Sequence, residues 1–146
     1  MYKRILVPLD GSETSNKALS AALRLAGESG GRVRLAHAVE ELGYLNGFGS
    51  YGAYSEDLVK SMRENGARIL NDGMAIAQAA GVEVDNTLYD NFGQRLAEVI
   101  CDAARRWNAD LIVVGTHGRR GVGRVLMGSG AEQIIRDAPV PVLVIR

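Results

Sequence analysis

Cysteine is nearly absent from this chain, since Cys101 is the only one among 146 residues. A single cysteine excludes an intrachain disulfide and any metal cluster built on cysteine ligands. The two histidines, His37 and His117, are far apart in the sequence. Nothing in the sequence therefore suggests a metal site.

An excess of charge of one sign is also missing. Lys plus Arg and Asp plus Glu each number 17, so the chain lacks the field that drives non-specific binding to nucleic acids or membranes. Long apolar runs are missing too, because none approaches the roughly 18 residues of a membrane span. The run before Asp10 is too short for the core of a signal peptide. We expect a cytoplasmic protein with no nucleic-acid and no membrane partner.

What the sequence does contain is a regular alternation of strand and helix signals. The hydrophobic share is 47% and the charged share 23%, which is typical of a globular chain, and the length fits one domain over residues 1–146. Short apolar or alternating runs predict five strands. They are Arg4–Leu9, Val33–Val39, Val82–Leu88, Leu111–Val114 and Val142–Ile145.

Helical periodicity and end signals predict a helix in each interval between strands. Ser12 or Thr14 can cap the first, and Gly30 can end it in the left-handed conformation. The second runs from about residue 55 to residue 80, with Leu58 and Met62 among the residues on its apolar side.

The third and fourth helices carry clearer start signals. Asn91 is expected to cap the third, with Gln94 three residues on as in a capping box. The fourth is expected over Ser129–Arg136. This order predicts a mainly parallel sheet with helices on both faces. Ligands of such sheets bind beyond the carboxyl ends of the strands, so Asp10 and Gly115 would share one crevice if the first and fourth strands are neighbours.

Two glycine patterns imitate nucleotide-binding motifs without their context. Gly47–Gly52 matches G-x-G-x-x-G, but residues 40–46 separate it from the preceding strand, and a match out of context is weak. Gly118–Val125 resembles a P-loop, yet Arg124 replaces the lysine and Val125 the hydroxyl residue that would hold magnesium. We therefore interpret the first pattern as a loop and not as a dinucleotide fingerprint, and we reject the second as the P-loop of an NTPase.

A third pattern lies between a strand and a helix, where phosphate loops work. It comprises Gly115–Gly118, nine further residues, and then Gly128 and Ser129. Glycines let backbone N–H groups approach phosphate oxygens, and a helix start favours an anion. Three arginines in the loop can neutralise phosphate charge; they are Arg119, Arg120 and Arg124.

With these motifs the whole chain resembles the universal stress protein family of the UspA type. The segments that carry the resemblance are Ile5–Ser12, His37–Val39, Ala109–Gly118, Gly128–Ser129 and Ala138–Ile145. The spacing G-x-x-G-x9-G-[ST] is the ATP-binding signature of that family and is complete here, whereas related members that do not bind ATP lack it. The resemblance implies an open, doubly wound, five-stranded sheet in the order 3-2-1-4-5.

The resemblance also implies a role for each matching position. Pro8, Leu9 and Asp10 would lie beside the nucleoside, with Asp10 accepting from ribose hydroxyls, and Ala38 and Val39 would meet the adenine through backbone groups. The ribose and phosphates would be held by Gly115, Thr116, His117, Gly118, Arg119, Arg120 and Gly121, and the outer phosphates by Gly128, Ser129, Gly130 and Ala131. A larger residue than Gly130 is usual at its position. ATP is the expected ligand, with ADP or AMP as alternatives and no clear protein ligands for magnesium.

Each candidate also has a plainer interpretation. Asp10 favours turns in any protein, and exposed arginines are often only solvated. His37 is interpreted as a packed strand residue and Cys101 as an inert core thiol. His117 can merely shape its loop, and the aromatic segment Tyr44–Tyr54 can be a surface loop or can shield a base or a partner.

The sequence thus leaves three functions open. The first is a non-enzymatic stress or signalling protein whose state depends on bound adenine nucleotide. The second is a slow ATPase, for which the sequence shows no general base, magnesium ligands or nucleophile. The third is a dimeric interaction module without nucleotide. A homodimer is expected in any case through the apolar final strand, Val142–Arg146, because prolines precede it and an uncovered edge invites pairing.

Overall fold

The computed structural model describes residues 1–39, 56–90, 93–116 and 127–146. Strands and helices alternate through these residues. The strands are β1 (Arg4–Pro8), β2 (Arg32–Ala38), β3 (Glu83–Tyr89), β4 (Leu111–Gly115) and β5 (Val142–Ile145), and the helices are α1 (Glu13–Ser29), α2 (Glu56–Ala79), α3 (Leu96–Trp107) and α4 (Ser129–Asp137). The Tyr44–Tyr54 segment, with its glycine pattern, lies outside the described residues.

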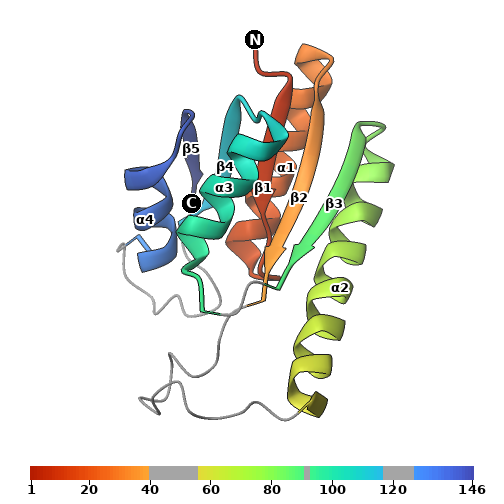
Figure 1. Cartoon of the computed structure of the whole chain (residues 1–146). Coiled ribbons are helices and arrows are strands. Elements are labelled where there is room, and N and C mark those ends of the chain that lie inside the picture. The colour runs from red at the N-terminus through yellow and green to blue at the C-terminus, as the bar shows by residue number, and fades with distance from the viewer. Residues whose placement is uncertain (40–55, 91–92, 117–126) are drawn as a thin grey trace.

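The five strands form one parallel sheet in the order β3-β2-β1-β4-β5. The predicted α/β class and strand order are confirmed, and β1 is indeed hydrogen-bonded to β4. Figure 1 shows α1 and α2 on one face and α3 and α4 on the other. This division follows from right-handed crossovers, because the winding reverses between β3 and β4.

Alternating strand residues divide the core into two layers. Ile5 and Val7 of β1 pack with the α1 and α2 side, whereas Leu6 packs with the α3 and α4 side. In β4, Val113 belongs to the first layer and Ile112 to the second. Strands that are buried on both faces have nearly continuous apolar sequences. This explains why the sequence alone predicted β1 and β4 as strands.

The ends of α1 follow the sequence signals. Ser12 is the N-cap, and its Oγ accepts from the N–H of Ser15 at 3.2 Å. Gly30 is the C-cap, with a φ of 62°. The capping prediction, which allowed Ser12 or Thr14, is thus confirmed for Ser12.

Helix α2 matches its predicted range but not its whole predicted apolar side. Its buried residues begin at Gly66, and Leu58, about two turns earlier, is 36% exposed. The predicted apolar side therefore includes Leu58, which the structure leaves exposed, whereas Ile69, Leu70 and Ala77 are buried as expected for that side. The first turns of α2 extend beyond the sheet in Figure 1, so no strand lies beneath them.

The start of α3 also differs from the prediction. The helix begins at Leu96, and its N-cap is Arg95, whose side chain makes no capping hydrogen bond. Asn91 itself lies outside the described residues, and the expectation that it caps this helix is wrong. The Asn–Gln spacing imitated a capping box four residues too early. Gly93 has a φ of 89°, which is incompatible with a right-handed helix that starts directly after Asn91.

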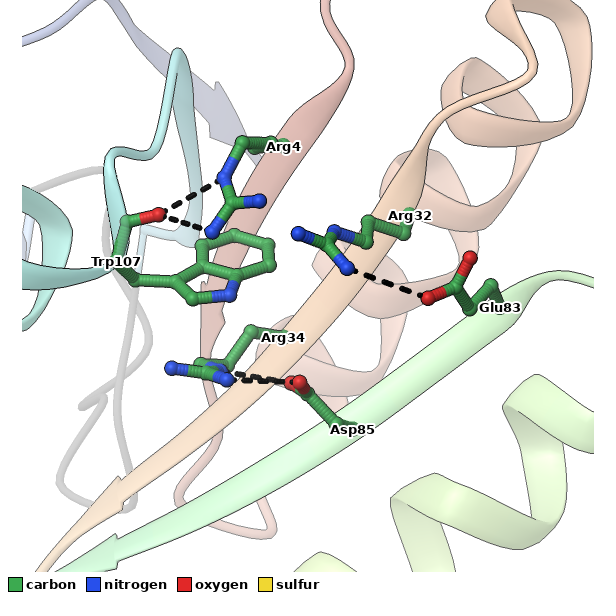
Figure 2. Close-up of polar contacts among 6 residues, drawn as sticks. All are labelled: Arg4, Arg32, Arg34, Glu83, Asp85 and Trp107. Carbon is green, nitrogen blue, oxygen red and sulfur yellow. Dashed lines mark hydrogen bonds and ion pairs between the residues drawn. The ribbon is translucent and has the colours of Figure 1, made fainter.

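A cluster of arginines around Trp107 closes the amino-terminal end of the sheet (Figure 2). The guanidinium carbons of Arg4 and Arg34 lie 4.5 and 4.8 Å from the centroid of the indole, within cation–π range. Arg34 also makes two 2.7 Å hydrogen bonds to Asp85, which raise the pKa of its guanidinium. These contacts fasten the end of α3 to β1, β2 and β3.

Candidate nucleotide-binding site

Most predicted site residues that the structure describes gather at the carboxyl edge of the sheet. Pro8 is the last residue of β1, Ala38 of β2 and Gly115 of β4. Because β1 lies between β2 and β4 in a parallel sheet, these three strand ends open onto the same side. That is the lower side in Figure 1, where α4 also begins.

The exit from β1 is shaped by Asp10. Its Oδ1 accepts a hydrogen bond from the N–H of Ser12 at 2.9 Å, and the intervening Gly11 has a φ of 82°. Asp10 is half-buried. It therefore has the turn role that its plainer interpretation expected, and the contact of its carboxylate with a ribose stays a prediction.

The exit from β2 is tied to both neighbouring strands. The N–H of Val39 donates to the carbonyl oxygen of Tyr89 at 2.8 Å, and the N–H of Leu9 donates to that of Ala36 at 2.8 Å. Nδ1 of His37 lies 2.7 Å from the carbonyl oxygen of Leu9. His37 is a packed strand residue, as predicted, but sequence reasoning missed this contact because it depends on the register of β1 against β2.

The exit from β4 lies directly against the start of α1. A Cβ on Gly115 would stand 2.7 Å from the carbonyl carbon and oxygen of Thr14, so residue 115 has room only for glycine. Thr116 continues the strand by donating from its N–H to the carbonyl oxygen of Ile145 at 2.8 Å. Sequence reasoning assigned Gly115 to phosphate binding and missed its contact with Thr14.

The two ends of the glycine-rich segment meet. The N–H of Gly128 donates to the carbonyl oxygen of Thr116 at 2.6 Å, so the chain leaves β4 and enters α4 at one place. The predicted contacts His117, Gly118, Arg119, Arg120 and Gly121, together with Arg124, lie outside the described residues.

Helix α4 begins where the sequence predicted. Gly128 is its N-cap and Ser129 its first residue. The first N–H groups of a helix have no partner within it, so this end offers donors toward the carboxyl edge of the sheet. Ala131 is buried, and a Cβ on Gly130 would lie 3.0 Å from Cδ2 of Leu96. The unusual Gly130 is thus matched by a leucine that occupies the adjoining space.

The described residues bear on three expectations, which concern metal ligands, Cys101 and membrane spans. No group of three His, Cys, Asp or Glu that could hold a metal ion occurs among residues 1–39, 56–90, 93–116 and 127–146. Cys101 is buried in α3, and burial raises the pKa of its thiol, as expected for a core residue. In the same ranges no helix is long and apolar enough to cross a bilayer.

Comparison with known proteins gives one consistent family. The model of the universal stress protein family matches residues 1–146. A universal stress protein of Thermus aquaticus is 33% identical over 147 aligned residues, which cover 100% of both chains. The crystal structure of a universal stress protein family member from Burkholderia pseudomallei is 37% identical, covers 99% of this chain and 96% of its own, and has a TM-score of 0.78.

Two further solved structures of the same fold were determined with nucleotides. One is a universal stress protein in complex with cAMP, 24% identical, with a TM-score of 0.72 over 99% of this chain and 97% of its own. The other is the universal stress protein from Archaeoglobus fulgidus in complex with dAMP, 23% identical, with a TM-score of 0.73 over 99% and 98%. At these identities the likeness shows the shared fold.

Proposed function

The chain belongs to the universal stress protein family, and from this premise we propose that it binds an adenine nucleotide, with ATP as the expected ligand, at the carboxyl edge of its sheet. The observation that carries the proposal is the 2.6 Å hydrogen bond between Gly128 and Thr116. This bond brings the start of α4 beside the ends of β1 and β4. The backbone N–H groups that would bind phosphate and the strand-end residues that would bind the nucleoside therefore lie at the same edge of the sheet.

The proposed binding mode assigns the nucleoside to the strand ends and the phosphates to the glycine segment. Asp10 accepts from the ribose hydroxyls through its carboxylate, whose oxygens can each accept more than one hydrogen bond. Backbone groups of Ala38 and Val39 meet the adenine. Ser129 and its neighbours donate to the outer phosphates, where the helix dipole favours negative charge.

The two family members in complex with cAMP and dAMP agree with the ligand class. Both ligands contain adenine and one phosphate, whereas the glycine spacing of this chain matches the signature that the family resemblance associates with ATP. We therefore propose that the ligand of this chain is ATP, on the basis of its own glycine segment. The protein's role is to change its shape or partners with the nucleotide it holds, without catalysing a reaction.

Binding can be tested first on the purified protein without any added ligand. The protein is denatured, and the supernatant is analysed for ATP, ADP and AMP by ion-exchange chromatography. Calorimetric titration with each nucleotide and with cAMP follows on nucleotide-free protein. Retained nucleotide or a saturable heat supports the proposal, and the absence of both contradicts it. Steady phosphate release from ATP would instead favour the slow ATPase.

The contact with Asp10 is tested by Asp10→Asn. The amide oxygen still accepts from the N–H of Ser12, so the turn is kept, but the charged acceptor for the ribose is lost. We expect about tenfold weaker binding of ATP, as for the loss of a hydrogen bond to a charged group. The control is Asp110→Asn at the opposite edge, where the carboxylate accepts from Lys3 and Arg4. That variant should bind ATP with unchanged affinity.

We also propose that the protein is a homodimer through β5. This strand is at an edge of the sheet, and an edge strand presents unpaired backbone groups to a second chain. The side chain of Leu143, within β5, is 37% exposed. A second copy pairing along this edge would cover it.

A further inference from the structure

Leu9, which leads from β1 to Asp10, is held from three directions. Its N–H donates to the carbonyl oxygen of Ala36, its own carbonyl oxygen lies 2.7 Å from Nδ1 of His37, and its buried side chain reaches α2 at Gly73. All three contacts come from β2 or α2. The exit of β1 is therefore fixed relative to β2 and not only to its own helix α1.

The imidazole of His37 adds a side chain–backbone contact between β1 and β2, just beyond their last backbone pair. The regular register ends with Pro8 opposite Ala36, so Leu9 and His37 follow the final pair. A carbonyl oxygen can only accept, which means that Nδ1 of His37 carries the proton and donates. The ring thus replaces a backbone donor at the point where the two strands begin to separate.

Two glycines of α2 allow that helix to close over the link. A Cβ on Gly66 would stand 2.7 Å from Cδ2 of His37, and one on Gly73 would stand 2.6 Å from Cδ1 of Leu9. Both glycines are buried. Helix α2 therefore packs directly against the imidazole and the leucine side chain, which leaves the ring little room to turn away from the carbonyl oxygen.

We propose that His37 is a positioning residue for the nucleoside half of the site, an inference that rests on the proposed nucleotide binding. His37 acts through the carbonyl oxygen of Leu9 and not by touching the ligand. By fixing Leu9 against β2, His37 sets the distance between Asp10 and Val39. In the proposed binding mode Asp10 binds the ribose and Val39 contacts the adenine. The phosphate half, formed around Gly128, is tied to β4 and does not depend on this link.

The inference is tested with two substitutions of different hydrogen-bonding capacity. His37→Phe keeps an aromatic ring but removes the donor, whereas His37→Asn places an amide donor where Nδ1 was. We expect His37→Phe to bind ATP and AMP about tenfold more weakly, the cost of one positioned hydrogen bond, and His37→Asn to restore most of that affinity. Tripolyphosphate, which lacks the nucleoside, should bind both variants as it binds the wild type.

The control for a general loss of stability is Trp107→Phe, which loosens the arginine cluster at the opposite end of the sheet. It should lower the melting temperature and leave nucleotide affinity unchanged. If His37→Phe does not fold, His37→Gln replaces it, because that amide reaches the position of Nε2 and leaves the carbonyl oxygen of Leu9 without its donor.

The outcomes separate this inference from the proposed function. Weaker nucleoside binding that His37→Asn restores, with tripolyphosphate binding unchanged, supports it. If the variant without the Nδ1 donor binds ATP and AMP with wild-type affinity, the role of His37 is refuted. An equal loss of affinity for AMP and tripolyphosphate also refutes it. Neither result contradicts the proposed nucleotide binding. A wild-type protein that binds none of the nucleotides defeats the proposed function itself, and this inference with it.

Discussion

The backbone of Gly115, at the end of β4, lies so close to Thr14 that a Cβ on residue 115 would be 2.7 Å from the carbonyl carbon and oxygen of Thr14. The contact joins the fourth strand to the first turn of α1. It gives the first glycine of the nucleotide motif a packing reason in addition to its proposed place near phosphate. The sequence alone shows the glycine but not which of the two reasons accounts for it.

The first prediction separates these two reasons. Gly115→Ala should lower the free energy of unfolding by about 3 kcal/mol, because the methyl group meets backbone that cannot move aside without shifting α1. Urea denaturation without nucleotide measures the loss. The matched control is Gly27→Ala in the same helix α1, where a Cβ meets nothing within 4 Å. Gly27→Ala should raise the free energy of unfolding by about 0.5–1 kcal/mol, because alanine favours the helix. If Gly115→Ala is as stable as the wild type, the packing role of Gly115 is refuted.

The second prediction concerns Gly130 and Leu96. A Cβ on Gly130 would be 3.0 Å from Cδ2 of Leu96, so Gly130→Val should overpack this junction of α3 and α4 and cost about 1–2 kcal/mol. In a Leu96→Val background the same change should cost about 1 kcal/mol less, since the two sites share one volume. Urea unfolding of the four proteins gives the coupling energy. Additive effects would mean that the leucine does not compensate for the glycine.

The architecture could be predicted from the sequence because its signals are local and repeated. The buried strands β1 and β4 are continuous apolar runs, and Ser12 and Gly30 mark both ends of α1. The position of the candidate site at the carboxyl edge then follows from strand order, which came from the family resemblance.

Other features could not be predicted because they depend on contacts between distant segments. The bond from His37 to Leu9 needs the register of β1 against β2, and the contact of Gly115 with Thr14 needs the placement of α1. The false cap at Asn91 shows the reverse case, in which a local signal is present but the backbone turns at Gly93, whose φ is 89°, before the helix begins. Helix α3 starts at Leu96, and its buried residues begin at Ala97.

The third prediction uses the raised pKa of Cys101. The thiol is 2% exposed, and burial is the main cause of the upward shift of its pKa. A raised pKa in the folded state means that the neutral thiol is favoured there. The stability from this group is therefore complete below the unfolded pKa of about 8.5 and is lost as the pH rises toward the folded value.

Two measurements check this behaviour. A thiol reagent should modify the native protein far more slowly than the urea-unfolded chain. The free energy of unfolding of the wild type, measured from pH 7.5 to 10, should fall more steeply than that of Cys101→Ala, by at most about 1.4 kcal/mol per pH unit. Equal slopes would show that the thiol ionises as easily in the fold as out of it.

The fourth prediction concerns the outer edge of β5. The carbonyl oxygens of Pro141 and Ile145 accept from β4, and main-chain groups alternate in direction along a strand. The N–H groups of Val142 and Val144 therefore point away from β4, where a second copy would pair. Leu143→Lys places a charge on this edge, which is how natural edge strands avoid pairing, and it should convert a dimer to a monomer.

Light scattering on a sizing column, run over a range of protein concentrations, measures the mass directly. The matched control is Ile76→Lys, because Ile76 on α2 is 41% exposed and Leu143 is 37% exposed, yet only the latter belongs to the proposed interface. Both variants add one positive charge and remove one exposed aliphatic side chain. A dimer that survives Leu143→Lys but dissociates on Ile76→Lys would move the interface to α2, and a wild type that is monomeric at every concentration would remove the β5 interface altogether.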